Sequence, residues 1–238
     1  AVCMSGPIFN IYKLDYTTRK LTTVPSGQIN YVNDLLTSSF SPNGLYVYTG
    51  IAFMSSVDVA SVDQGTGSLL TSTYTNNNSC SDANQIIFHP SGTVVYVGAK
   101  SIPAKINRYT VSPIDGTFGF LEECLLGTPG YYIGAMAIER TGRYLFAAAY
   151  GDSGILSSIP IDANGALIQG SIKTISAISY VRKLVVDPNG RYLYMAASYD
   201  GAQDYLKVYQ INADASLLEL STFDFGTTCN DVVSLSGV

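Results

Sequence analysis

Short apolar segments alternate along this chain with polar turns that contain glycine or proline. Four stretches share one pattern: "FSPNGLYVYTG" (40–50), "FHPSGTVVYVGA" (88–99), "IERTGRYLFAAA" (138–149) and "VDPNGRYLYMAA" (186–197). Their turn glycines are separated by 48, 50 and 48 residues, at Gly44, Gly92, Gly142 and Gly190. Each turn follows an apolar run and precedes a second run with an aromatic residue, at Tyr48, Tyr96, Phe146 and Tyr194. This pattern predicts strand–turn–strand units rather than helices.

Each repeat also predicts a third and a fourth strand, joined by a second turn. These turns read "VDQGTGSL", "PIDGTFGF", "IDANGAL" and "INADASL". A period in the forties that is filled with short strands is typical of a β-propeller, in which each repeat forms one four-stranded antiparallel blade. The first strand of each repeat is the most apolar, as expected for the innermost strand of a blade.

The two ends of the chain predict how the ring closes. "VCMSG" near the start resembles the second strand "YVYTG", and "NDVVSLSGV" at the end resembles the first strand "NDLLTSSFS". We expect the terminal strands to share one blade, which would remove exposed sheet edges. The prediction is therefore an all-β, five-bladed β-propeller that forms a single domain over residues 1–238.

Composition narrows the possible partners. The 238 residues are 47% hydrophobic and 13% charged, with a formal net charge of −5. No run of basic residues is present, so we expect no binding to nucleic acid or to a membrane surface. No apolar run approaches the roughly 20 residues of a membrane-spanning helix. We expect a monomer whose partner is a small-molecule substrate or a glycan.

Four cysteines and a sequon indicate the secretory pathway. Cys3, Cys80, Cys124 and Cys229 form no C-x-x-C pair, and Asn77 begins an N-x-S sequon. An even number of cysteines, the sequon and an N-terminus other than Met favour a secreted glycoprotein with disulfides. Cys3–Cys229 and Cys80–Cys124 are one candidate pairing among the three that four cysteines allow. A cytosolic protein with free thiols is the alternative.

The repeated pattern resembles a known family. "FSPNGLYVYTG", followed by segments such as "NRYTVSPIDGTFGFL" and "SSIPIDANGALI", is similar to the lactonase-type β-propellers, which include phosphogluconolactonases and fungal carboxy-muconate cyclases. The resemblance implies a lactonase, or a cyclase or isomerase such as those of fungal secondary metabolism. Family members usually have seven blades and carry histidines where the inner strands begin. Here those positions hold other residues, so the histidine chemistry of the family does not transfer.

The starts of the inner strands are the candidate site, because the loops of every blade of a propeller meet at that end of the channel. We predict catalytic roles for Arg182, Tyr132, Tyr180, Asp34, Asp82 and Asp231. We predict substrate contacts from Asn33, Asn84, Tyr131 and Asn230. Arginine binds carboxylates or enolates, tyrosine donates to an oxyanion, and one crowded carboxylate would move a proton. Such a site would need no metal and no cofactor.

Other interpretations remain open at this point. The aspartates can instead cap loops and join neighbouring blades, or supply oxygen ligands to calcium. His89, the one histidine, falls in a turn at the opposite end of the blades, where a surface role fits better than catalysis. A lectin-like binding module or a scaffold for partner proteins is also compatible with the fold. Aromatic residues at the channel mouth occur in only two repeats, which favours a single central site over one site per blade.

Overall fold

The computed structural model describes residues 2–54, 56–76, 82–126, 132–151, 154–177, 180–199 and 203–226. These residues form one three-stranded and four four-stranded antiparallel sheets. The first sheet contains β1 (Val2–Ser5), β2 (Ile8–Asp15) and β3 (Lys20–Asn30). The second contains β4 (Leu35–Phe40), β5 (Tyr46–Ile51), β6 (Ser56–Val62) and β7 (Leu69–Asn76). The third contains β8 (Ala83–Phe88), β9 (Val94–Ala99), β10 (Lys105–Val111) and β11 (Phe118–Leu125).

The last two sheets follow the same plan. The fourth contains β12 (Tyr132–Ile138), β13 (Tyr144–Tyr150), β14 (Ile155–Pro160) and β15 (Lys173–Ser176), with the short 3₁₀-helix η1 (Gln169–Ser171) before β15. The fifth contains β16 (Tyr180–Val186), β17 (Tyr192–Tyr199), β18 (Gln203–Ile211) and β19 (Leu217–Asp224). No helix in the described residues is long and apolar enough to cross a membrane.

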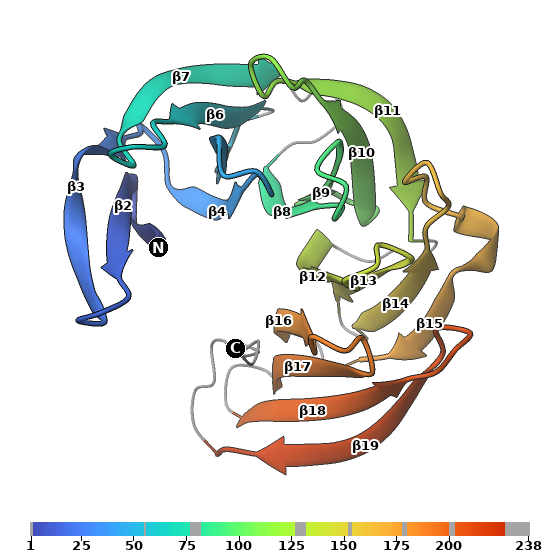
Figure 1. Ribbon diagram of the computed structural model, residues 1–238. Helices are drawn as coiled ribbons and strands as arrows, with labels where there is room; N and C mark the ends of the chain where they lie inside the picture. Colours follow the sequence, from blue (N-terminus) through green and yellow to red (C-terminus); the bar gives the residue numbers. More distant parts are fainter. Residues whose placement is uncertain are drawn as a thin grey trace.

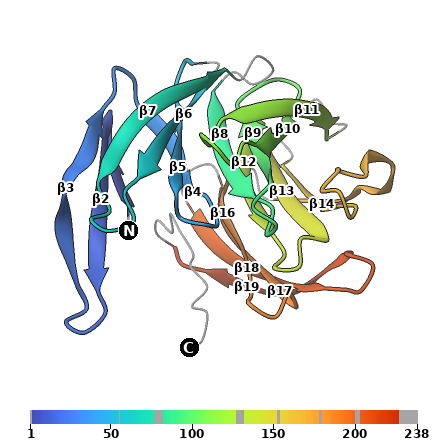
Figure 2. The ribbon, with the colours of Figure 1, turned by 45° about the horizontal axis from the view of Figure 1, so that its top comes forward.

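The sheets are arranged around a common centre as the blades of a propeller (Figure 1). The first strands of the four-stranded sheets lie innermost, and contacts run from β4 to β8, from β8 to β12 and from β12 to β16. Figure 2 shows the same order from a second direction. The predicted all-β architecture with four-stranded antiparallel blades is therefore confirmed. The strand expected to complete the first sheet, within residues 230–238, lies outside the described residues, so the blade number and the closure stay predictions.

The recurring turn has the same hydrogen bonds in every four-stranded sheet. In the first of them, Ser41 accepts a hydrogen bond from the backbone N–H of Gly44 at 2.8 Å and donates its own N–H to Tyr46 O at 2.9 Å. Gly44 has a φ of +71°, which glycine adopts at little cost. Equivalent bonds form around His89, Glu139 and Asp187. His89 is therefore a turn residue, and its Nδ1 lies 2.8 Å from Ser91 Oγ.

Aromatic residues on the second strands hold neighbouring sheets together. Tyr48 and Tyr96 are completely buried. The Tyr48 hydroxyl donates to Gly116 O of the next sheet at 2.8 Å, and the Tyr96 hydroxyl donates to Gly165 O at 2.7 Å. A Cβ at Gly116 would lie 2.9 Å from the Tyr48 hydroxyl, so only glycine permits this approach. Two of the four aromatic residues of the sequence pattern, Tyr48 and Tyr96, thus form an interlock between neighbouring blades.

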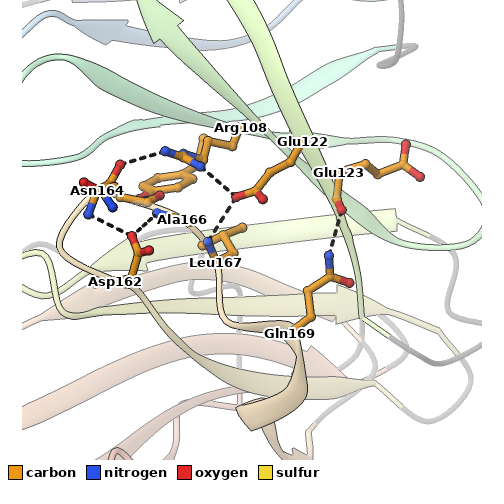
Figure 3. Close-up of polar contacts among 10 residues, drawn as sticks. Arg108, Glu122, Glu123, Asp162, Asn164, Ala166, Leu167 and Gln169 are labelled. Atoms are coloured by element: carbon orange, nitrogen blue, oxygen red, sulfur yellow. Dashed lines mark hydrogen bonds and ion pairs between the residues drawn. The ribbon is translucent and has the colours of Figure 1, made fainter.

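A polar network adds a second connection between the third and fourth sheets, at their outer side (Figure 3). The Arg108 guanidinium pairs with Glu122 at 3.1 Å and donates to Asn164 O at 2.7 Å. Glu122 also accepts the backbone N–H of Leu167 at 3.2 Å, and Gln169 donates to Glu123 O at 2.9 Å. These bonds fasten β10 and β11 to the loop between β14 and β15. Because several groups share the network, it contributes more to the stability of the fold than an isolated surface ion pair would.

Cys124 is a free, fully buried thiol. The expected Cys80–Cys124 disulfide is therefore not formed, because the Cys124 side chain packs among Tyr96, Ile106 and other residues of the core between the third and fourth sheets. Burial raises the pKa of this thiol to about 12. Cys80 and Cys229, and the sequon at Asn77, lie outside the described residues, so Cys3–Cys229 stays a prediction.

The interlock predicts a measurable coupling between Phe146 and Ala215, which occupy the positions of Tyr48 and Gly116 in a later pair of sheets. Phe146→Tyr alone should destabilise the fold by about 1–2 kcal/mol. The reason is that a Cβ at the equivalent Gly116 would lie only 2.9 Å from the Tyr48 hydroxyl. Adding Ala215→Gly should recover most of this loss by allowing the hydrogen bond seen in the other sheets. Denaturant unfolding of the wild type, both single variants and the double variant gives the coupling energy. Additive effects would contradict the interlock.

Burial also predicts the reactivity of Cys124. Iodoacetamide at pH 8 should leave this thiol unlabelled in the native protein and label it in denaturant without reductant, as peptide mapping by mass spectrometry would show. The raised pKa favours the protonated thiol in the folded state, so its contribution to stability is present below about pH 9 and declines between pH 9 and 12. Labelling of the native protein at the denatured rate would contradict the burial, and no labelling in denaturant would indicate a disulfide.

Candidate functional site

Every four-stranded sheet has a β-bulge at the same place in its innermost strand. The strand registers skip one residue each in β4, β8, β12 and β16, and the extra residues are Leu36, Asn84, Gly134 and Arg182. A bulged residue has no partner across the ladder, and bulges commonly redirect side chains beside functional sites. The repeat therefore presents four different side chains from one structural position.

Three of these bulge residues line one cavity. Its volume is about 230 Å³, and its lining consists of Asn84, Tyr132, Gly134, Tyr150, Tyr180, Val181 and Arg182. The structure thus brings together four residues predicted from the sequence, Asn84, Tyr132, Tyr180 and Arg182, from three different sheets. Gly134 allows this assembly, because a Cβ there would lie 2.8 Å from the carbonyl oxygen of Val181 on the neighbouring inner strand.

Tyrosines form the apolar part of the cavity wall. The rings of Tyr132 and Tyr150 stack with centroids 4.6 Å apart, and Tyr150 meets Tyr180 edge-to-face at 4.4 Å. Tyr132 and Tyr150 are register partners at the ends of β12 and β13, whereas Tyr180 begins β16. Such aromatic pairs stabilise one another beyond the apolar area that they bury. The three rings are therefore held in a fixed arrangement across two sheets.

The tyrosine hydroxyls and Asn84 provide neutral hydrogen-bonding groups. Burial raises the pKa of Tyr132 above its ordinary value, and the nearby Tyr180 raises it further, while a hydrogen bond with the Tyr150 side chain and the Arg182 charge act in the opposite direction. Tyr132 consequently keeps its proton at neutral pH and can donate it in a hydrogen bond. The Asn84 amide donates to Ile133 O at 2.6 Å, which orients its side chain and joins two inner strands.

Arg182 supplies the charge at the cavity. Its side chain is exposed, and within the described part of the chain it takes part in no ion pair or hydrogen bond. The described residues that line the cavity include no carboxylate. The cavity therefore combines an available guanidinium with protonated phenols, which together suit an anionic or carbonyl-bearing ligand.

Asp34, Asp82 and Asn33 occupy neighbouring positions but are not among the residues that line this cavity. Asp34 immediately precedes β4 and Asp82 immediately precedes β8, at the strand ends where Tyr132 and Tyr180 begin β12 and β16. Asp82 accepts a hydrogen bond from the backbone N–H of Phe53 in the preceding sheet, which fits the loop-capping interpretation. Asn33 lies in the loop before β4. Within the described ranges, no group of three His, Cys, Asp or Glu side chains is placed to hold a metal ion.

Three predicted residues, Tyr131, Asn230 and Asp231, lie outside the described residues. Two residues near the site were missed by the sequence analysis. Tyr150 ends β13, and Lys100 follows β9 with its ammonium 5.5 Å from the centroid of the Tyr132 ring. Tyr150 follows Ala149, which pairs with Ile133, the second residue of β12. Lys100 follows Ala99, which pairs with Ala83, the first residue of β8. The regular recurrence of the second strands along the sequence was the signal that could have identified the residues at their ends.

Comparisons with known proteins agree with this fold. A candidate 6-phosphogluconolactonase from Bacteroides uniformis aligns with a TM-score of 0.74 and 16% identity over 95% of this chain and 67% of that one. Another from Bacteroides fragilis aligns with a TM-score of 0.73 and 15% identity over 93% of this chain and 65% of that one. A periplasmic gluconolactonase from Pseudomonas aeruginosa aligns with a TM-score of 0.61 and 16% identity over 92% of this chain and 78% of that one. At these identities the likeness shows the fold alone, and the chain spans about two thirds of the length of the two Bacteroides proteins.

No curated protein matches the chain. A sequence profile of one family, described as "Lactonase, 7-bladed beta-propeller", matches residues 46–177, which is more than half of the chain and extends from the second strand of the second sheet to the end of the fourth. The resemblance inferred from the repeats is thereby confirmed, and the chain belongs to the lactonase β-propeller family.

Proposed function

We propose that this protein is a lactonase that hydrolyses small sugar lactones in the cavity at the inner-strand bulges. The observation that carries the proposal is the Arg182 guanidinium, which has no partner among the described residues and lies near the protonated hydroxyl of Tyr132. A lactone carbonyl placed between them would accept hydrogen bonds from both groups. Membership of the lactonase family supports this choice of reaction.

The proposed chemistry is the addition of water across the acyl C–O bond. Water attacks the carbonyl carbon, and negative charge develops on the carbonyl oxygen, where Arg182 and Tyr132 stabilise it. The ring C–O bond then breaks, the ring oxygen takes up the proton that the attacking water has lost, and a hydroxy acid is released. Because Arg182 is exposed, the cavity is open to the solvent water that this step consumes. The cationic guanidinium also suits the carboxylate of the product.

The substrate class follows from the size and lining of the cavity. A volume of about 230 Å³ suits a single small ring. Asn84, Tyr150 and Tyr180 offer hydrogen-bonding groups for ring hydroxyls, and the stacked tyrosines offer apolar surface. The names of the structural relatives, which include gluconolactonases, support an aldonolactone as the substrate. A cyclase or isomerase would use the same donors, and a sugar-binding protein would use the same aromatic wall without turnover.

The test is the hydrolysis of D-glucono-δ-lactone, followed with a pH indicator and corrected for spontaneous opening. Wild-type protein should accelerate hydrolysis, and Arg182→Ala should lower kcat/KM by roughly 10²–10³-fold, the usual effect of removing an oxyanion donor. Tyr132→Phe should lower it less. Lys183→Ala is the matched control, because Lys183 is the next residue of β16 but does not line the cavity.

Unchanged melting temperatures would show that the variants are folded. Wild-type rates in Arg182→Ala would contradict the assigned role of this residue. Gluconate binding without acceleration by the wild type would favour the lectin-like alternative.

We also propose that residues 230–238 complete the first blade beside β1 and so close a five-bladed ring. The support is the match between "NDVVSLSGV" and the first strand "NDLLTSSFS", together with the place of β1, which pairs with β2 as β5 pairs with β6.

Deletion of residues 230–238 should then lower the stability by about 2–5 kcal/mol, as expected when several core side chains are lost. Deletion of residues 237–238 alone is the control and should have little effect. Equal melting temperatures for both truncated proteins and the wild type would contradict the closure.

A further inference from the structure

A separate cavity lies between the fourth and fifth sheets, at the opposite end of the inner strands from the proposed lactonase site. Its volume is about 170 Å³. The fourth sheet contributes Glu139, Arg143 and Tyr144 to its lining, and the fifth contributes Gly190 and residues 211–213. These residues lie in or beside the turns that follow the inner strands and the third strand of the fifth sheet. The cavity therefore shares no residue with the proposed lactonase site.

Glu139 occupies the first position of the recurring turn, but its side chain does not serve that turn as the equivalent side chains do. Ser41 Oγ accepts the backbone N–H of Tyr46 at 3.0 Å, and Asp187 Oδ1 accepts the backbone N–H of Tyr192 at 2.7 Å. Among the described residues, no backbone N–H donates to the Glu139 carboxylate. The turn itself therefore does not require a glutamate at this position.

One oxygen of this buried carboxylate has no donor. The Glu139 side chain is only 7% exposed, and its Oε2 accepts a hydrogen bond from the Thr141 hydroxyl. Within the described ranges, no group donates to its Oε1. This oxygen lies beside Gly190 of the fifth sheet, where an added Cβ would be 3.0 Å from it. A buried acceptor without a donor is costly, so a ligand that donates to Oε1 would be stabilised in the cavity.

Arg143 places unused donors at the same cavity. Its Nε donates to Thr141 Oγ1 at 2.9 Å and lies 3.9 Å from Glu139 Oε2. Its guanidinium carbon lies 5.7 Å from the centroid of the Tyr144 ring. The two terminal nitrogens form no hydrogen bond or ion pair with the part of the chain that the structure describes. Because the Arg143 side chain is 68% exposed, these nitrogens can bind a ligand while the existing contacts remain.

We infer that this cavity binds a small α-amino acid in its zwitterionic form. The ammonium group of the ligand donates to Glu139 Oε1, and the ligand carboxylate accepts hydrogen bonds from the terminal nitrogens of Arg143. The volume of about 170 Å³ is smaller than that of a drug-sized pocket, so the ligand has a short side chain. Tyr144 and Ile211 supply apolar surface for this side chain. An amine or a carboxylic acid would use only one of the two charged groups.

Binding of three probes to the full chain, followed by NMR chemical shifts, tests this inference. L-Alanine carries both charges, whereas propionate has only the carboxylate and ethylamine only the ammonium group. L-Alanine should bind at least roughly tenfold more tightly than either of the other probes, which is the effect of one charge-assisted hydrogen bond. The shifts should be largest at the backbone amides of Gly190 and Ala213, which border the cavity.

Two variants separate the charged groups. In Glu139→Gln, alanine should bind no more tightly than propionate, because the ammonium group loses its ionic acceptor. In Arg143→Met, alanine should bind no more tightly than ethylamine. Arg191→Met is the matched control, because Arg191 lies over Tyr192 as Arg143 lies over Tyr144 but does not line the cavity. Melting temperatures check that each variant is folded, and the exposed Arg143 still tests the site if Glu139→Gln is unstable.

Three results would overturn the inference. The first is the absence of alanine binding to the wild type. The second is a wild-type affinity for ethylamine or propionate that equals the affinity for alanine. The third is alanine binding that neither Glu139→Gln nor Arg143→Met weakens. None of these measurements uses a lactone, so each of the three results leaves the proposed lactonase function untouched.

Discussion

The close approach of neighbouring sheets is the constraint on which the rest of the structure depends. Each blade is a simple antiparallel meander that cannot bury both faces by itself, so it is stable only between two others. The hydroxyls of Tyr48 and Tyr96 each donate to a backbone carbonyl in a turn of the following sheet, and at the first of these turns Gly116 leaves room for the Tyr48 hydroxyl. The outer network around Arg108 and Glu122 connects the third and fourth sheets at a second level (Figure 3). Because the sheets are fixed in this way, the inner-strand ends have defined positions relative to one another.

The candidate site exploits this rigidity through one local irregularity. A bulge recurs in every inner strand, and the repeat varies its residue from leucine to asparagine, glycine and arginine. The glycine allows the fourth and fifth sheets to approach, and the asparagine and arginine supply polar groups to the cavity between them. The symmetric scaffold thereby yields an asymmetric site. This explains how a family defined by structural repeats can place specific chemistry at one side of its channel.

The electrostatics of the site contrast with those of the whole chain. The protein is acidic overall, yet Arg182 lines the cavity and no carboxylate is among the described lining residues. Arg182 forms no ion pair within the described part of the chain, whereas Lys105, Arg108 and Lys207 pair with nearby glutamates. The phenol of Tyr132 lies near Arg182 and remains protonated because burial raises its pKa. A guanidinium without an internal carboxylate partner is well suited to a ligand that brings its own negative charge.

The sequence alone determined the strand order, the turns, the four-stranded blades and four of the residues that line the cavity. These follow from local patterns, because alternating polarity and turn glycines act within a few residues and the repeat then multiplies the signal. Only the tertiary structure decided which side chains meet across blades. It turned Asp82 toward the Phe53 amide, left Cys124 as a buried thiol, and brought Tyr150 and Lys100 to Tyr132. Such contacts depend on how closely neighbouring sheets approach, and no local pattern in the chain encodes that distance.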